Sequence, residues 1–76
     1  MKDFALIAEE KLQIPRESIQ DSLTPYDVPD WDSMNYLLFI AELEKEYNIS
    51  FNMDEILSAG SIGDLKKLIR DKGIAL

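Results

Sequence analysis

One serine and three nearby aspartates are the residues of this sequence best suited to chemistry. Ser33 follows Asp32 directly, and Asp27 and Asp30 lie a few positions earlier. Paired carboxylates can act as general acid and base, or they can bind a cation such as calcium. A serine hydroxyl can carry a covalent group. The first question is which of these uses the rest of the chain supports.

Catalysis by the chain itself finds little support, because the sequence has no histidine and no cysteine. It therefore lacks the usual general base at neutral pH and the best nucleophile. We predict no catalytic residues, although a small enzyme that uses the aspartate cluster stays open as a rival. Nothing beside Ser33 can activate its hydroxyl, so a separate enzyme would have to modify it.

A calcium site is not predicted either. A calcium loop that starts at Asp27 or Asp30 needs a glycine at its sixth position and a glutamate at its twelfth. Those places hold Asp32 and Leu38 in the first register, and Asn35 and Ala41 in the second. The simpler interpretation of the three aspartates is a solvated loop followed by a helix cap.

The chain has 76 residues and a net charge of −7. Residues 21 to 56 hold nine acidic residues and a single basic one. Such a surface would repel nucleic acid and anionic membranes, so we expect protein partners with basic or mixed surfaces. No segment approaches the length of about 18 apolar residues that a membrane span needs. We expect a single domain over residues 1–76 that is monomeric and cytoplasmic.

Helical spacing of apolar residues predicts an all-α fold. Phe4, Ile7, Ala8 and Leu12 indicate a first helix that ends before Pro15. The following residues, up to Asp30, contain all three prolines and predict a long loop. Apolar residues of this loop are expected to reach the core; they are Ile14, Ile19 and Leu23.

A second helix is predicted over residues 33–47, with Asp32 as its N-cap. One face of this helix should be buried; its residues are Tyr36, Phe39, Ile40, Leu43 and Tyr47. The opposite face should be exposed; its residues are Met34, Leu38, Ala41, Glu42 and Lys45. This outward face is partly apolar, which is typical of a docking surface.

Two capping boxes predict the remaining helices. In "NMDEIL", Asn52 can cap a short third helix with Glu55 three places later. In "SIGDLKKLI", Ser61 and Asp64 repeat the pattern just after Gly60. The last helix should bury one apolar stripe; its residues are Ile62, Leu65, Leu68 and Ile69. The prediction is a small bundle of three full helices and one short third helix.

Four stretches together resemble the acyl carrier protein family, which includes peptidyl and D-alanyl carriers. They are "IPRESI", the triplet Asp32-Ser33-Met34, "LEKEYNISF" and "SIGDLKKLI". The resemblance covers the whole chain and implies a four-helix bundle of the acyl-carrier-protein type. It also implies that Ser33 carries a 4′-phosphopantetheine arm, donated by coenzyme A through a phosphopantetheinyl transferase. A helix start suits this group, because its dipole favours a phosphodiester.

The resemblance also implies partners and a role. The arm would hold acyl or aminoacyl groups as thioesters for loading and acyl-transferring enzymes, in fatty acid, polyketide or nonribosomal peptide biosynthesis. D-alanine stays open as a cargo beside these. We expect partner contacts at five residues next to the arm; they are Asp32, Met34, Leu38, Ala41 and Glu42. The alternative is an unmodified acidic helical module that binds other proteins.

Two features depart from the fatty-acid carriers. Those carriers have a glycine three places before the serine, where this chain has Asp30 followed by the bulky Trp31. They also tend to have acidic residues where this chain has Asn35 and Leu38. We therefore expect a different loop flexibility and a different choice of partner.

Overall fold

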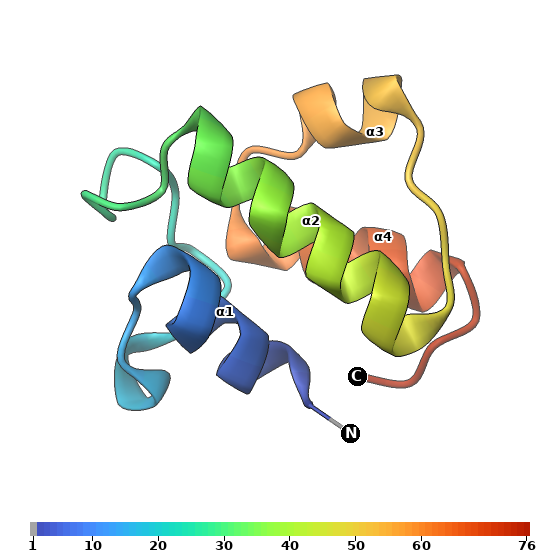
Figure 1. Ribbon diagram of the computed structural model, residues 1–76, viewed down its shortest axis with the longest axis horizontal. Helices are drawn as coiled ribbons and strands as arrows, with labels where there is room; N and C mark the ends of the chain where they lie inside the picture. The colour runs from blue at the N-terminus through green and yellow to red at the C-terminus, as the bar shows by residue number, and fades with distance from the viewer. Residues whose placement is uncertain (1) are drawn as a thin grey trace.

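The computed structural model describes residues 2–76, and within that range it is all-α with four helices and no strand. The helices are α1 (Phe4–Leu12), α2 (Ser33–Tyr47), α3 (Met53–Ser58) and α4 (Ile62–Asp71). This confirms the predicted bundle with three full helices and a short third one. A 3₁₀ turn, η1 (Arg16–Ser18), was not predicted and interrupts the long loop. Helices α1 and α3 lie on opposite sides of α2 (Figure 1).

Helix α1 has well-defined ends that fix where the loop begins. Asp3 caps the helix by accepting a 2.8 Å hydrogen bond from the backbone N–H of Leu6. At the other end, Gln13 has a φ of 57°, the left-handed conformation that commonly ends helices. The guanidinium of Arg16 then donates two 3.1 Å hydrogen bonds to the Asp3 carboxylate. The chain after α1 is thereby tied back to the start of the same helix.

Helix α2 supplies the centre of the core. Phe39 and Leu43 are completely buried and Ile40 nearly so, whereas Tyr36 and Tyr47 are partly buried. The Phe39 ring meets the Phe4 ring of α1 edge to face, with centroids 5.5 Å apart. Aromatic pairs favour this geometry. The predicted core face of the second helix is confirmed.

Helix α4 closes the core through Ile62, Leu65 and Ile69, which have no exposed surface. Leu68, predicted in the same stripe, is only partly buried at the edge of the core. Ser61 caps the helix as predicted, through a 3.1 Å hydrogen bond from the Asp64 backbone N–H. The predicted capping box is wrong in its second half. The Asp64 carboxylate accepts from the backbone N–H of Gly60 at 2.9 Å, one residue before the cap.

The long loop between α1 and α2 is held against the bundle. Ile14 is buried, and Ile19 and Leu23 pack against the core, as predicted. The backbone N–H groups of Ile62 and Gly63 donate to the carbonyls of Leu23 and Asp21, at 3.0 and 2.9 Å. A Cβ on Gly63 would lie 3.0 Å from the Asp21 Cβ, so a larger residue there would push the loop and the helix slightly apart. The loop therefore has a fixed position at the start of α4.

Across residues 2–76, none of the helices has the length and apolar character needed to cross a membrane.

Candidate functional site

Ser33 is the first residue of α2 and is exposed to solvent. The residue before it, Asp32, is the N-cap, and its carboxylate accepts a 2.8 Å hydrogen bond from the backbone N–H of Asn35. The Asn35 side chain in turn donates to the backbone carbonyl of Asp30 at 2.8 Å. These two contacts fix the backbone on both sides of Ser33, so its hydroxyl is presented from a well-defined helix start.

Trp31 anchors the loop immediately before the site. Its side chain is buried, and its ring lies 6.0 Å from the ring of Tyr36 on α2. Its backbone N–H donates to the carbonyl of Val28, which is also buried. Trp31, the bulky residue next to Asp30, therefore adds a contact with the core. The segment leading to Ser33 is held by packing.

The helix start favours a negatively charged group at Ser33. The first turn of a helix leaves backbone N–H groups unpaired, and the helix dipole adds partial positive charge there. Within α2 itself, the first turn contains no acidic residue, although the capping residue Asp32 is one. A phosphodiester on the Ser33 oxygen would lie beside this end of the helix.

Two of the three aspartates near Ser33 have structural roles. The Asp27 carboxylate accepts hydrogen bonds from the backbone N–H and the hydroxyl of Thr24, both at 3.1 Å. Asp32 caps α2. In the part of the chain that the structure describes, residues 2–76, no group of three acidic residues is arranged to hold a metal ion.

Two adjoining hollows border Ser33, between α2, α3 and the end of the loop. Their volumes are about 280 and 230 Å³. Both are lined by Ser33, Tyr36, Ile56 and Leu57; the larger adds Leu37 and Met53, and the smaller adds Pro25, Trp31, Asp32 and Ala59. The serine hydroxyl thus sits at the edge of a mainly apolar groove.

The predicted outer face of α2 is mostly where the sequence placed it. Met34, Leu38 and Ala41 are exposed along the helix from Ser33. Glu42 differs, because its side chain is only 15% exposed and lies 3.8 Å from the Lys2 ammonium. It therefore contributes little to a charged rim.

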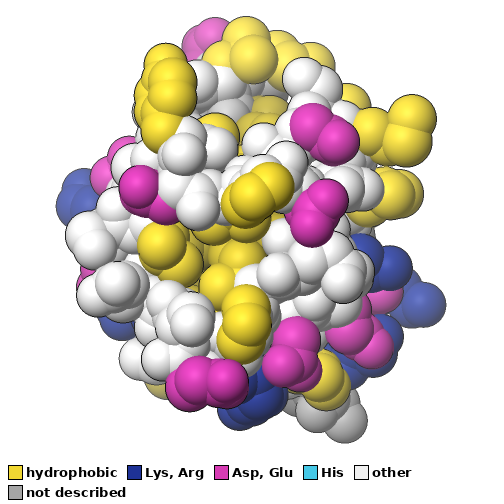
Figure 2. Space-filling view, turned by 90° about the vertical axis from the view of Figure 1, so that its left-hand side faces the viewer, with side chains coloured by type: hydrophobic (Ala, Val, Ile, Leu, Met, Phe, Trp, Pro, Cys, Tyr) yellow, Lys and Arg dark blue, Asp and Glu magenta, His cyan; other side chains and the backbone are white. Residues whose placement is uncertain are grey.

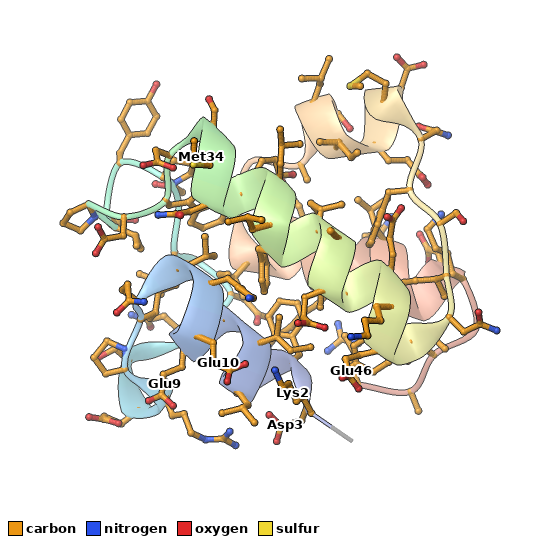
Figure 3. The ribbon with its side chains drawn as sticks, viewed as in Figure 1. Lys2, Asp3, Glu9, Glu10, Met34 and Glu46 are labelled. Carbon is orange, nitrogen blue, oxygen red and sulfur yellow. The ribbon has the colours of Figure 1, made fainter. Side chains whose placement is uncertain are left out.

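Lys2 lies among acidic side chains, at a place remote from Ser33. Its ammonium lies 2.8 Å from the Glu10 carboxylate, and its backbone N–H donates to Glu46 at 3.3 Å. In Figure 3, Met34 lies at the start of α2, whereas Lys2 and Glu10 lie beside α1 and Glu46 lies near the other end of α2.

Sequence reasoning missed three exposed apolar residues next to the site, namely Leu37, Met53 and Leu57. Met53 and Leu57 are four positions apart, a spacing that places them on one face of α3. That spacing was the available signal. It could not show whether the shared face points to the core or to solvent, because this depends on how α3 packs.

A small helical bundle that presents a serine at the exposed start of its second helix has the architecture of a carrier domain. The chain belongs to the phosphopantetheine attachment site family, whose sequence model matches residues 4–69. Its fold is similar to the solved structure of a candidate acyl carrier protein, Rv0033, from Mycobacterium tuberculosis. That similarity has a TM-score of 0.80 at 20% sequence identity and covers 91% of this chain and 92% of the other. No curated protein sequence matches the chain significantly.

Proposed function

We propose that the protein is an acyl carrier whose Ser33 oxygen is joined to a 4′-phosphopantetheine arm. The observation that carries this proposal is the position of Ser33, exposed as the first residue of α2 within the segment that matches the family. In the modification, the Ser33 oxygen forms a bond to the phosphorus next to the pantetheine. The phosphoanhydride bond of coenzyme A breaks, adenosine 3′,5′-bisphosphate leaves, and the serine proton is released.

The chain's own residues prepare the attachment site but do not perform the reaction. Asp32 and Asn35 hold the helix start, and the helix dipole favours the phosphodiester. A phosphopantetheinyl transferase would then catalyse the attachment. The arm ends in a thiol, a group that the cysteine-free chain lacks. On that thiol, acyl or aminoacyl groups would be carried as thioesters.

The proposed partners are the transferase and the enzymes that load the arm or remove its acyl group. Each must contact the protein beside Ser33, where Asp32, Met34, Leu38 and Ala41 are exposed. Apolar side chains with acidic neighbours suit partners that have basic or mixed docking surfaces. We further propose that residues 1–76 act as one carrier domain, monomeric and cytoplasmic, as the sequence predicts.

Incubation with coenzyme A and a broad-specificity phosphopantetheinyl transferase tests the proposal by intact-mass measurement. The wild-type protein should gain one phosphopantetheine, and Ser33→Ala should gain none while keeping its helix content, because Asp32 still caps α2. Separate Ser22→Ala, Ser58→Ala and Ser61→Ala proteins are controls that should still be modified. No mass gain in the wild-type protein would favour the unmodified interaction module. A gain that persists in Ser33→Ala would refute Ser33 as the attachment residue.

A further inference from the structure

A further hollow lies at the end of the bundle away from Ser33, and we call it the distal hollow. Its volume is about 370 Å³, and it lies where the start of α1, the end of α2, α4 and the C-terminal segment meet. Tyr47, which lines it, is the last residue of α2, and Ser33 is the first. The two residues are therefore roughly 20 Å apart along the helix axis. The distal hollow is separate from the attachment site.

Apolar side chains form most of the walls of the distal hollow. They come from α1, from the end of η1, from the end of α2 and from the C-terminal segment; they are Phe4, Ala5, Ile19, Tyr47, Ala75 and Leu76. Gly73, with a φ of 95°, turns the chain after α4. The Ile74 backbone N–H then donates to the Ile69 carbonyl at 3.3 Å, and the Ile74 side chain packs against the core. This helix end places the last two residues as one wall of the hollow.

Basic side chains of α4, Lys66 and Arg70, complete the lining. The Lys66 ammonium is already paired with the Asp21 carboxylate at 3.0 Å. Asp3, the acidic residue of the lining, accepts two 3.1 Å hydrogen bonds from Arg16. Within residues 2–76, no carboxylate lies within ion-pair distance of the Arg70 guanidinium. The other charges cancel in pairs, so the distal hollow has one positive charge in excess.

The rest of the surface offers an anion little attraction. The chain has a net charge of −7, and Lys45 is the only basic residue from position 21 to 56. Figure 2 shows the face with the loop and the start of α2: hydrophobic and acidic side chains share its upper part, and the visible basic side chains lie toward its edges and lower part. An anionic ligand would be repelled from the surroundings of Ser33 and attracted to the basic side chains of α4.

The lining of the distal hollow indicates the class of ligand. The planar guanidinium of Arg70 can donate two parallel hydrogen bonds to a carboxylate. A small inorganic anion would leave the apolar walls uncovered, and an uncharged apolar molecule would leave the guanidinium unpaired. A volume of about 370 Å³ is in the range of small-molecule sites. One carboxylate joined to an apolar chain satisfies both parts of the lining.

We propose that the distal hollow binds the anion of a medium-chain monocarboxylic acid. The carboxylate pairs with the Arg70 guanidinium, Lys66 adds a second positive charge nearby, and the alkyl chain covers the apolar walls. The inference goes beyond the proposed function, because it needs no modification of Ser33. It gives the chain a non-covalent ligand in addition to the covalent group.

Titration of octanoate into isotope-labelled protein at about pH 7, where the carboxylate is ionised, tests the site through backbone amide chemical shifts. Amides of residues that line the distal hollow should shift, among them Ala5, Ile19 and Tyr47, and those of Ser33 and Asn35 should not. Acetate supplies the charge without the chain, and 1-octanol supplies the chain without the charge. Octanoate should bind at least about fivefold more tightly than either compound.

Arg70→Gln removes the excess charge and should weaken octanoate binding by about threefold or more. Lys67→Gln is the matched control, because it removes a positive charge from the same helix, where Lys67 is exposed and does not line the distal hollow. It should bind octanoate like the wild type, and so should Ser33→Ala. Arg70 is exposed as well, so both charge variants should keep the wild-type melting temperature.

Four results would overturn the inference. Unshifted amides around the distal hollow would refute the site, and shifts centred on Ser33 would assign octanoate to the groove beside that residue. Acetate or 1-octanol that binds as tightly as octanoate would refute the ligand class. Wild-type affinity in Arg70→Gln would exclude the guanidinium from recognition. Each result leaves the proposed function intact, because transfer of phosphopantetheine to Ser33 is measured separately.

Discussion

The phenol hydroxyl of Tyr36 donates a 2.7 Å hydrogen bond to the backbone carbonyl of Ile56, twenty positions later in the chain. The same ring packs against Trp31 at a centroid distance of 6.0 Å. One side chain thus connects the loop before Ser33, helix α2 and helix α3. Burial raises the pKa of Tyr36, so the hydroxyl remains a protonated donor at neutral pH.

Tyr36→Phe should loosen α3 with little effect on the core. The substitution keeps the ring and removes one hydrogen bond, so the free energy of unfolding should fall by about 0.5–1.5 kcal/mol. Amide hydrogen exchange in Met53–Ser58 should speed up more than exchange in α1. Tyr26→Phe is the control, since the Tyr26 side chain is fully exposed. Equal exchange of α3 in Tyr36→Phe and wild type would show that this hydrogen bond does not hold the helix.

Helix boundaries could be predicted from the sequence where capping residues determine them. Asp32 and Asn52 cap the two helices that flank the groove, as predicted, because a short polar side chain that meets the N3 backbone N–H is a local interaction. Apolar spacing likewise identified Phe39 and Leu43 as core residues. Local capping and helical periodicity need no knowledge of the tertiary arrangement.

The surface around Ser33 was harder to predict from the sequence, because it depends on packing between segments that are distant in sequence. The Glu42 carboxylate lies near the ammonium of Lys2, forty positions earlier. No local sequence pattern indicates this contact. Leu57 is exposed because α3, which hydrogen bonds with Tyr36 and Lys72, packs Ile56 and not Leu57 against the core. The position of Ser33 was predictable, whereas the neighbours that complete its groove were not.

Glu55 should make part of the stability dependent on acid pH. Hydrogen bonds from the Asn52 backbone, and then from the Lys72 ammonium, lower the pKa of Glu55 below its ordinary value of 4.5. A folded-state pKa that is lower than the unfolded one stabilises the fold above the unfolded pKa, and this stabilisation is lost as the pH falls through the folded pKa.

Urea unfolding of wild type and Glu55→Gln, followed from about pH 7 to about pH 3, measures this contribution. The wild-type protein should be the more stable of the two at neutral pH, and the difference should shrink below about pH 4.5 as Glu55 becomes protonated. Glu17→Gln is a control, because Glu17 is exposed in η1. A difference between wild type and Glu55→Gln that stays constant across this range would contradict the role of the Glu55 charge.

Asp32 combines a structural role with an expected role in partner binding, and two substitutions separate them. Asp32→Ala removes the cap of α2 and should cost about 0.5–2 kcal/mol of stability. Asp32→Asn keeps an oxygen that can accept from the Asn35 N–H, so its melting temperature should stay near the wild-type value. If the Asp32 charge assists the transferase, Asp32→Asn should still be modified more slowly at low salt, with the difference shrinking as salt rises. Equal rates for Asp32→Asn and wild type at low salt would confine Asp32 to capping.

Leu38 provides the test of the outer face of α2. It is exposed one turn beyond Met34, so Leu38→Asp should leave the fold and its melting temperature almost unchanged. An enzyme that docks on this apolar face would have to bury the new carboxylate, which is costly unless it is paired. Transfer of the acyl or aminoacyl group to the modified carrier by its loading enzyme should slow at least about tenfold, a loss of about 1.4 kcal/mol in transition-state stabilisation.

Lys45→Ala is the natural comparison for Leu38→Asp, because Lys45 lies on the same outer face two turns further from Ser33 and is exposed. The loading rate of Lys45→Ala should change by less than about twofold, as expected for a rim charge.

Moderate salt should reduce the association rate of the wild-type carrier with its loading enzyme more than it raises the dissociation rate, since the acidic residues act mainly on encounter. Leu38→Asp loaded at the wild-type rate would instead indicate that acidic residues alone form the α2 interface, because an apolar contact at this position could not accept a carboxylate without loss of rate.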